Sequence, residues 1–377
     1  MQNSQCIARI RDRQDLPPAT EYLTLSHSWG KIPFVTLTKS NYSQAKASLN
    51  VDGLAPLFQD ALRIATLLGF KYIWIDSLCI MQDSTEDWLH ESQKMHDVYE
   101  NSACNLAATG LHDGREKLLM ERHQNQVVCH INTEQGGERF VLTPDEWEAQ
   151  VNAAPLHRRA WVFQKQIMVL GSILPSAQLM VSRADLEQAP RILYFGRMQL
   201  FWECSAKIGS EVFPWDMPMS ARQNDLKRIV ALPKGLPDDP LLVGDLYRQW
   251  QRLVRLYTKG KLTYSMDKLP ALSGLAKKFR YHLDDEYLAG LGKPYRAPSW
   301  SWASTDSAVW YPPWINSENW QPSVRVLEAS ATPLDKDTTG QLTAGHILLS
   351  GPLQKVFISK PPDIRWGKHE FRVTRSA

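Results

Sequence analysis

The feature that most constrains the fold is a nearly continuous apolar run, residues 71–76 (KYIWID), which follows a segment with helical spacing. Runs of this kind fill central parallel strands that are buried on both faces of a sheet. The preceding residues, 55–68, carry apolar side chains at the spacing of one helical face. Gly69 follows at the position where a C-cap glycine is expected. The sequence therefore predicts a helix that leads directly into a buried strand.

The same alternation continues on both sides of this pair. Residues 22–30 have the composition of a strand that ends in a glycine turn, and residues 104–110 form a candidate third strand. Between them, residues 85–101 predict a helix, with Ser84 as its N-cap and acidic residues in the first turn. Strand, helix, strand, helix, strand predicts an α/β fold, a Rossmann-like parallel sheet with flanking helices.

The remainder of the chain gives weaker signals. A hairpin is expected around 138–143, helix over most of 225–258, and a strand at 296–309 with Trp300 and Trp302 on one side. The C-terminal third is therefore expected to be β-rich. We predict three parts: an α/β domain at 1–168, an insertion at 169–188, and a helical, then β-rich, extension at 189–377.

Composition excludes several classes of protein. The net charge is +3 and no concentrated basic patch is visible in the sequence, so no nucleic-acid partner is expected. No apolar stretch is long enough to span a bilayer, and the chain starts without an apolar signal segment, so a cytoplasmic location is expected. Five scattered cysteines form no C-x-x-C pair and H-E-x-x-H is absent, so reduced thiols and no metal site are expected.

Polar residues follow the first two predicted strands at the points where they end. Ser26 and Trp29 close the first strand, and Asp76 and Cys79 close the second. Ligands collect beyond the carboxyl ends of parallel strands, so these four residues are candidates for lining a ligand site. The alternative is structural: Asp76 caps the next turn and Cys79 is a small buried side chain.

Glu91 is a candidate catalytic residue. It lies on the flank of the apolar stripe of helix 85–101, where a carboxylate needs a partner or takes a raised pKa. It therefore either forms a structural ion pair with a residue such as Arg158 or Arg159, or acts as an acid–base group that faces a cleft.

Arg159 and Trp161 form a second candidate site. Arginine binds carboxylates and phosphates with two hydrogen bonds, and tryptophan stacks on a base, so the pair suits a nucleotide. The alternative is a buried arginine–glutamate pair enclosed by tryptophan.

Several stretches in a fixed order resemble the fungal heterokaryon-incompatibility domain. They are residues 23–30 (LTLSHSWG), 60–61, 68–83 (LGFKYIWIDSLCIMQD), 87–88, 91, 95, 99 and 159–164 (RAWVFQ), followed by 201–204 and 296–304. The resemblance implies a role in non-self recognition and programmed cell death, with partners that are other proteins, including copies of the same chain.

This family is thought to be distantly similar to Toll/interleukin-receptor (TIR) domains, some of which cleave NAD. The resemblance thus implies a TIR-like fold and makes NAD a possible substrate, although no cofactor is established by the sequence. Glu91 resembles, by its placement, the helical glutamate that contacts the nicotinamide ribose in those enzymes. A NAD- or nucleotide-cleaving enzyme is therefore one alternative, and a repurposed small-molecule-binding protein of specialised metabolism is another.

Two departures from the family pattern affect these expectations. Ala160 stands where the family usually has glycine, and Lys165 stands where it usually has glutamate, so a carboxylate has become an ammonium. In addition, the chain would read smoothly from 168 into 189, and the intervening residues begin with Val169 and end with Gln188, as a translated intron would. We hypothesise that 169–188 is a retained intron, which transcript sequencing would decide.

Overall fold

The structure is a computed structural model of the 377-residue chain. It describes residues 8–122, 127–133, 136–142, 146–163, 191–204, 207–215, 217, 240–262, 264–283, 301–309, 324–334 and 336–352. The proposed insertion, 169–188, lies outside these residues, and the predicted division into three parts stays a prediction.

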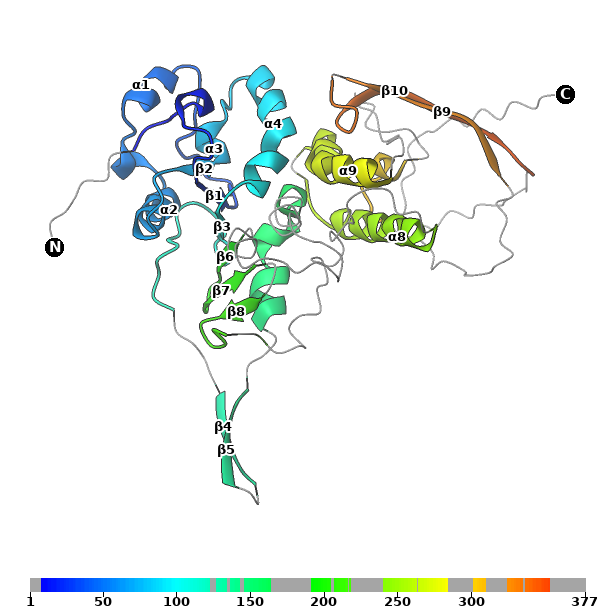
Figure 1. The fold of residues 1–377 in the computed structure, drawn as a ribbon. Coiled ribbons are helices and arrows are strands. Elements are labelled where there is room, and N and C mark those ends of the chain that lie inside the picture. Colours follow the sequence, from blue (N-terminus) through cyan, green and yellow to red (C-terminus); the bar gives the residue numbers. More distant parts are fainter. Residues whose placement is uncertain are drawn as a thin grey trace, which may run out of the picture.

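A six-stranded sheet organises the chain up to residue 210 (Figure 1). In spatial order its strands are β2 (Ile73–Ile75), β1 (Leu23–Ser26), β3 (Cys104–Ala107), β6 (Ile192–Phe195), β7 (Leu200–Glu203) and β8 (Ile208–Ser210). The first four strands are parallel, and β7 and β8 continue the sheet in antiparallel pairing. The predicted α/β fold with a parallel sheet is confirmed, whereas its likeness to TIR domains stays a prediction.

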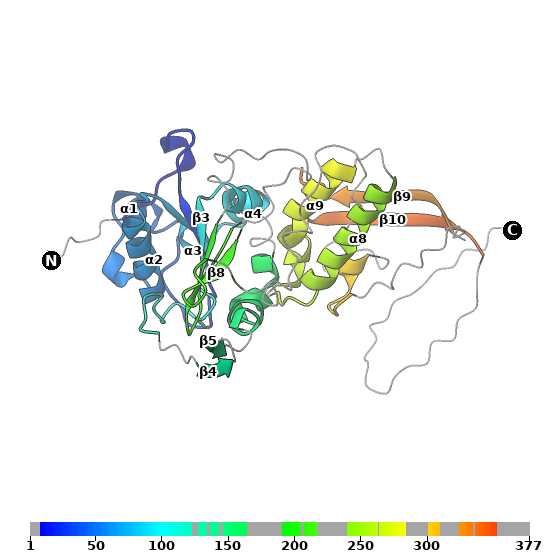
Figure 2. The same ribbon diagram turned by 60° about the horizontal axis from the view of Figure 1, so that its bottom comes forward.

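Two helices cover opposite faces of this sheet. Helix α2 (Pro56–Leu67) connects β1 to β2 on one side of β1, and α4 (Thr85–Glu100) then leads back across β1 to β3 (Figure 2). Right-handed connections in opposite directions along a sheet place their helices on opposite faces. The point where the direction reverses lies between β1 and β3, which is where ligands collect in sheets of this kind.

Helix α2 ends, and helix α4 begins, at the residues that the local sequence signals predict. Gly69 has φ +81°, and Phe70 N–H donates to the carbonyl of Ala65, so α2 ends in a left-handed glycine cap. At the start of α4 the hydroxyl of Ser84 accepts a hydrogen bond from Asp87 N–H at 3.4 Å. The two predicted helices are confirmed, and the run at 71–76 does form a parallel strand. The expectation that this strand is central and buried on both faces is wrong: among the described strands β2 lies at the edge of the sheet and pairs only with β1, so Ile73 and Trp74 are half-buried and only Ile75 is buried.

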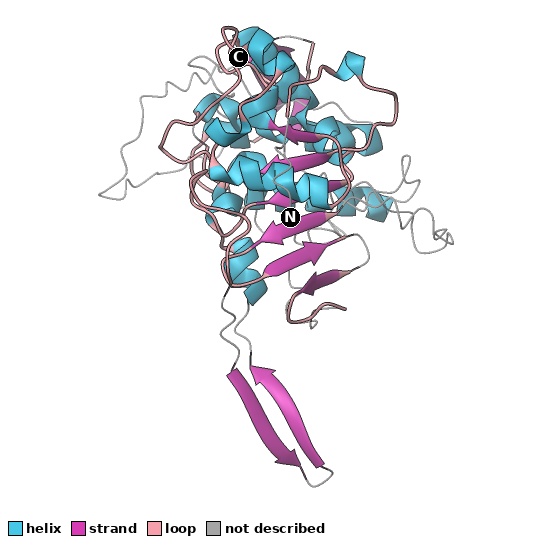
Figure 3. Cartoon of the chain, turned by 90° about the vertical axis from the view of Figure 1, so that its left-hand side faces the viewer, coloured by secondary structure: helices cyan, strands magenta, loops and turns pink. Residues whose placement is uncertain are grey.

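Smaller elements complete this part of the chain. They are the helices α1 (Tyr42–Ala47) and α3 (Asp76–Cys79) and the hairpin of β4 (Val127–Thr133) and β5 (Gly136–Leu142). Figures 1 and 3 both show the hairpin extending away from the sheet. A hairpin in this region is therefore confirmed.

The C-terminal part consists of a helix pair and a second hairpin. Helices α8 (Pro240–Tyr257) and α9 (Pro270–Leu283) pack through a buried apolar core. Helix α9 also contacts α4, and Lys278 Nζ lies 2.7 Å from a carboxylate oxygen of Glu100. The hairpin of β9 (Arg325–Pro333) and β10 (Leu342–Ser350) lies beside α9 and joins it through Lys277 and Asp337, 3.0 Å apart.

The predicted strand at 296–309 is wrong where the structure describes it. Trp302–Ser304 form a 3-10 turn, because the hydroxyl of Ser301 accepts a hydrogen bond from Ala303 N–H at 3.2 Å. Trp302 is half-buried and packs edge-on against Tyr257, as a core residue does. Trp300 lies outside the described residues. None of the helices in the described ranges has the length and hydropathy that a membrane-spanning helix requires.

Candidate functional site

The carboxyl ends of β1 and β2 bring Asp76 and Trp29 together, as the sequence predicts for neighbouring strands. Trp29 Nε1 donates to Asp76 Oδ1 at 3.3 Å, and Ser77 N–H donates to the same oxygen at 2.8 Å. The Asp76 side chain is 14% exposed. Asp76 is therefore held by two hydrogen bonds at the first residue of α3, while part of its carboxylate still faces solvent.

His27 is the imidazole at the centre of this arrangement. Its side chain is fully buried, its Nδ1 lies 3.8 Å from Asp76 Oδ1, and its ring stacks parallel to that of Trp29. Phe34 and Phe58 pack against it edge-on. The sequence places His27 at the end of a strand, but only the tertiary contacts show that it lies inside an aromatic cluster.

Arg159 reaches the end of β1 from a distant part of the chain. Its Nη1 donates to the backbone carbonyl of His27 at 3.0 Å. A buried backbone carbonyl just after the end of a strand needs such a donor, because water does not reach it. The guanidinium thus connects the segment around 159 to the first strand. Its described hydrogen bond goes to a backbone carbonyl and not to a glutamate, the acceptor that the structural alternative predicts.

Cys79 lies one turn beyond Asp76 and accepts a weak hydrogen bond from Ile75 N–H at 3.5 Å. Burial raises the pKa of its thiol to about 12, and the negative charges of Asp76 and Glu91 add to the increase. A thiol with this pKa is protonated at physiological pH, whereas a nucleophilic cysteine needs a thiolate. The environment of Cys79, which is half-buried, therefore suits a structural thiol.

Glu91 is half-buried on α4, with 24% of its side chain exposed. Burial raises its pKa, and the nearby charges of Lys94 and His90 offset part of the increase. Within the described part of the chain, His90 Nε2 at 3.9 Å is the one basic group inside ion-pair distance. The ion pair with Arg158 or Arg159 offered as the structural alternative is not found there.

A buried polar layer runs between β1 and β3. The hydroxyls of Thr24 and Ser26 each lie 3.2 Å from Asn105 Oδ1, and all three residues are at most 1% exposed. The side chain of Ser26 therefore lies in a buried layer on one face of the sheet and does not reach an open cleft. Nearby, among the described residues, the buried hydroxyl of Thr109 has no hydrogen-bond partner.

Trp161 joins the sheet to the helix pair. Its Nε1 donates to Asp267 Oδ2 at 3.0 Å, and its ring meets Trp88 of α4 edge-on at 6.3 Å. Burial raises the pKa of Asp267, and the hydrogen bond from Trp161 lowers it in part. The backbone of the neighbouring Ala160 pairs with Lys261 beyond α8. This segment is therefore the junction between the two halves of the structure.

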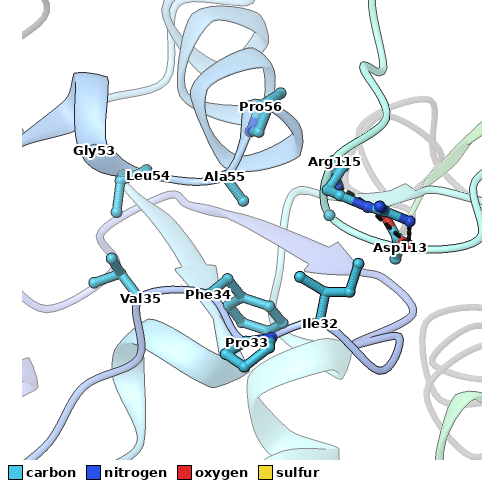
Figure 4. A pocket seen from close by; sticks show the side chains of 11 residues that line it. Ile32, Pro33, Phe34, Val35, Gly53, Leu54, Ala55, Pro56, Asp113 and Arg115 are labelled. Carbon is cyan, nitrogen blue, oxygen red and sulfur yellow. Dashed lines mark hydrogen bonds and ion pairs between the residues drawn. The ribbon is translucent and has the colours of Figure 1, made fainter.

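A separate cavity of about 310 Å3 lies at the same edge of the sheet, on the face covered by α2. Its walls come from the loop after β1, the turn before α2 and the loop after β3 (Figure 4). The lining residues are Ile32, Pro33, Phe34, Val35, Gly53, Leu54, Ala55, Pro56, Asp113, Gly114 and Arg115. The sequence analysis did not find this site, since its walls come from three separate loops.

The chemistry of this cavity is mainly apolar. Arg115 and Asp113 pair with each other at its rim, with Nη2 and Oδ2 2.7 Å apart. The start of α2 offers no free amide for an anion, because Leu57 N–H donates to Gly114 and Phe58 N–H donates to Ala55. The cavity therefore suits an apolar group better than a phosphate. Within the described ranges, no cluster of histidine, cysteine and acidic residues is arranged to hold a metal ion.

Comparisons with known proteins identify the first part of the chain. No curated protein and no solved structure matches it. Residues 22–165 match the family described as Heterokaryon incompatibility protein (HET). These residues include the sheet strands β1 to β3, the helices α2 and α4, and the junction at Arg159. Residues 22–165 of the chain thus form a heterokaryon-incompatibility domain.

Proposed function

We propose that this protein acts in fungal non-self recognition in the cytoplasm and passes on a cell-death signal by assembling with other protein chains. Its partners are copies of the same chain or proteins that are produced by incompatible cells. The family match supports the recognition role. One observation favours assembly over chemistry: three of the groups that the sequence offers for ligand binding, on Asp76, Arg159 and Trp161, already have structural partners.

Three contacts make up that observation. The carboxylate of Asp76 accepts from the indole of Trp29, and the guanidinium of Arg159 donates to a backbone carbonyl. The indole of Trp161 donates to Asp267. A ligand that used these groups would have to replace contacts that hold the domain together, so the free energy of binding would be offset by their loss. A binding module needs no such exchange.

Forced assembly tests this proposal. The full chain is fused to a module that dimerises when a drug is added, and the fusion is expressed in a fungal host at a level that leaves the cells alive. We expect cell death after the drug is added, and none with the dimerisation module alone. Survival of cells in which the fused chains are shown to be joined would overturn the proposal.

A second candidate is cleavage of NAD or a related nucleotide, because burial raises the pKa of Glu91. Perturbed carboxylates are typical of acid–base sites. In this alternative, water attacks the ribose carbon, the glycosidic bond breaks, its electron pair goes to the nicotinamide nitrogen, and the proton of the attacking water goes to the Glu91 carboxylate and then to solvent. Glu91 assists this loss, and Arg159 or Trp161 holds the nucleotide.

Release of free nicotinamide from NAD separates the two candidates. Glu86, an exposed acid on the same helix, is the matched control. Release that is lost in Glu91→Ala but kept in Glu86→Ala, with both variants folded, would favour the enzyme. No release from folded, assembled protein would remove it.

A further inference from the structure

Two features of the surface have no role in the site described above, and they have opposite shapes. One is the apolar cavity of about 310 Å3 between the loops after β1 and β3. The other is Trp215, whose side chain is 82% exposed on the loop that follows β8. Large aromatic side chains bury 150–250 Å2 when they pack, so a tryptophan this exposed is unusual unless it serves an interface.

The cavity has the size and lining of a socket for one aromatic side chain. Its volume is at the lower end of the range of about 300–1,000 Å3 for ligand pockets. Phe34 lies in its wall, and Ile32 and Val35 at its rim are 42% and 44% exposed. These exposed apolar side chains would be covered by a partner that inserts an indole ring.

Trp215 does not line the cavity of its own chain, and its side chain is exposed. Strand β8 runs parallel to β1, so the loops after both strands lie at the same edge of the sheet. The order β1-β3-β6-β7-β8 separates them by four strand spacings, which is roughly 19 Å. The protrusion and the socket are therefore two different surfaces of one molecule.

The charges around the two surfaces are complementary. Exposed Lys31 precedes the cavity loop and is positive, whereas exposed Glu211 on the loop that carries Trp215 is negative; Arg115 at the rim is paired with Asp113. Arginine beside a pocket also stacks well on an inserted indole ring.

We infer that Trp215 of one copy occupies the cavity of a second copy. Because the contact joins two different surfaces, it is heterologous, and its repetition produces a ring or an open filament. The biological meaning of this contact rests on the proposed function, for which it names the partner as a second copy of the chain. Its physical existence can be tested separately.

Two complementary variants test the contact by analytical ultracentrifugation. Trp215→Ala removes the protrusion and leaves the socket, and Ile32→Glu puts a charge in the socket and leaves the protrusion. We expect the wild type to self-associate with increasing concentration and each variant alone to stay monomeric. Loss of such an anchor weakens binding on the order of 30-fold or more. An equal mixture of the two variants should form a one-to-one pair and nothing larger.

The controls are exposed residues outside both surfaces. Tyr264→Ala and Leu67→Glu, at sites 69% and 73% exposed, should associate like the wild type. Circular dichroism checks that every variant is folded. A monomeric wild type, continued association of either variant, or failure of the mixture to pair would overturn the contact. The forced-assembly experiment does not depend on Trp215, so death in that experiment would leave the proposed function intact.

Discussion

Replacing Trp161 with phenylalanine should weaken the junction between the sheet and the helix pair, and the loss should depend on pH. The change keeps an aromatic ring but removes the N–H that donates to Asp267 at 3.0 Å. Asp267 is only 8% exposed, so water replaces the lost donor poorly. A hydrogen bond to a charged group contributes about 1.5–3 kcal/mol. We therefore expect the free energy of unfolding to fall by about 2 kcal/mol near neutral pH.

The sign of the pH dependence follows from the pKa of Asp267. Burial raises it above the ordinary value of 3.8, so the folded state holds this proton more tightly than the unfolded state. Stability therefore falls as the pH rises from 3.8 through the folded pKa, and is constant above it. Without the Trp161 donor the folded pKa is higher still, so the decline continues to higher pH. The deficit of the variant should grow with pH.

Urea unfolding at about pH 4 and about pH 7.5 measures this difference. Because the dependence of stability on urea becomes steeper with chain length, a loss of about 2 kcal/mol corresponds to a midpoint shift of about 0.5 M urea in a chain of this size. Trp88→Phe is the control. It makes the other ring of the edge-on contact at 6.3 Å smaller, but it leaves the hydrogen bond from Trp161 to Asp267 in place. An equal deficit for Trp161→Phe at both pH values, or a loss no larger than that of the control, would refute the reasoning.

Three further predictions concern the sheet domain. Gly69 and Gly30 both have positive φ, but an added Cβ at Gly69 meets nothing within 4 Å, whereas at Gly30 it would lie 2.4 Å from the Cβ of Asp113. Thermal denaturation should therefore show a loss of about 1 kcal/mol for Gly69→Ala and a clearly larger loss for Gly30→Ala. Ser84→Ala should cost about 1 kcal/mol through loss of the N-cap of α4, measured in the same way. Burial raises the pKa of Cys79 to about 12, so mass spectrometry should find it alkylated slowly in the folded protein and rapidly in urea. Equal losses for the two glycines, or fast alkylation of the folded protein, would contradict these predictions.

The parts of the fold that sequence predicts are those fixed by local chemistry. Helix α4 begins after Ser84 because a hydroxyl there satisfies a helix amide, and α2 ends at Gly69 because that residue adopts a left-handed backbone. The apolar run at 71–76 predicts the strand β2, although it does not predict that this strand lies at the edge of the sheet with Ile73 and Trp74 half-buried. Each of these signals lies within a few residues of its effect.

The contacts that decide the candidate site join distant residues, so local patterns do not predict them. Helical angles place Glu91 on the flank of an apolar stripe, but they do not show that Arg159 donates to His27, 132 residues away. Likewise, Trp161 and its acceptor Asp267 are 106 residues apart. The alternation of large and small side chains around Trp302 is typical of a strand, but the hydroxyl of Ser301 stabilises a turn there.

The central claim is that this protein signals by binding other chains and not by a reaction at Glu91. The most direct test is the fraction of dead cells in a fungal host that expresses wild type, Glu91→Gln or the control Glu86→Gln at matched levels, with each variant shown to be folded. Our account predicts the same death rate for all three proteins. Loss of killing in Glu91→Gln alone would contradict it.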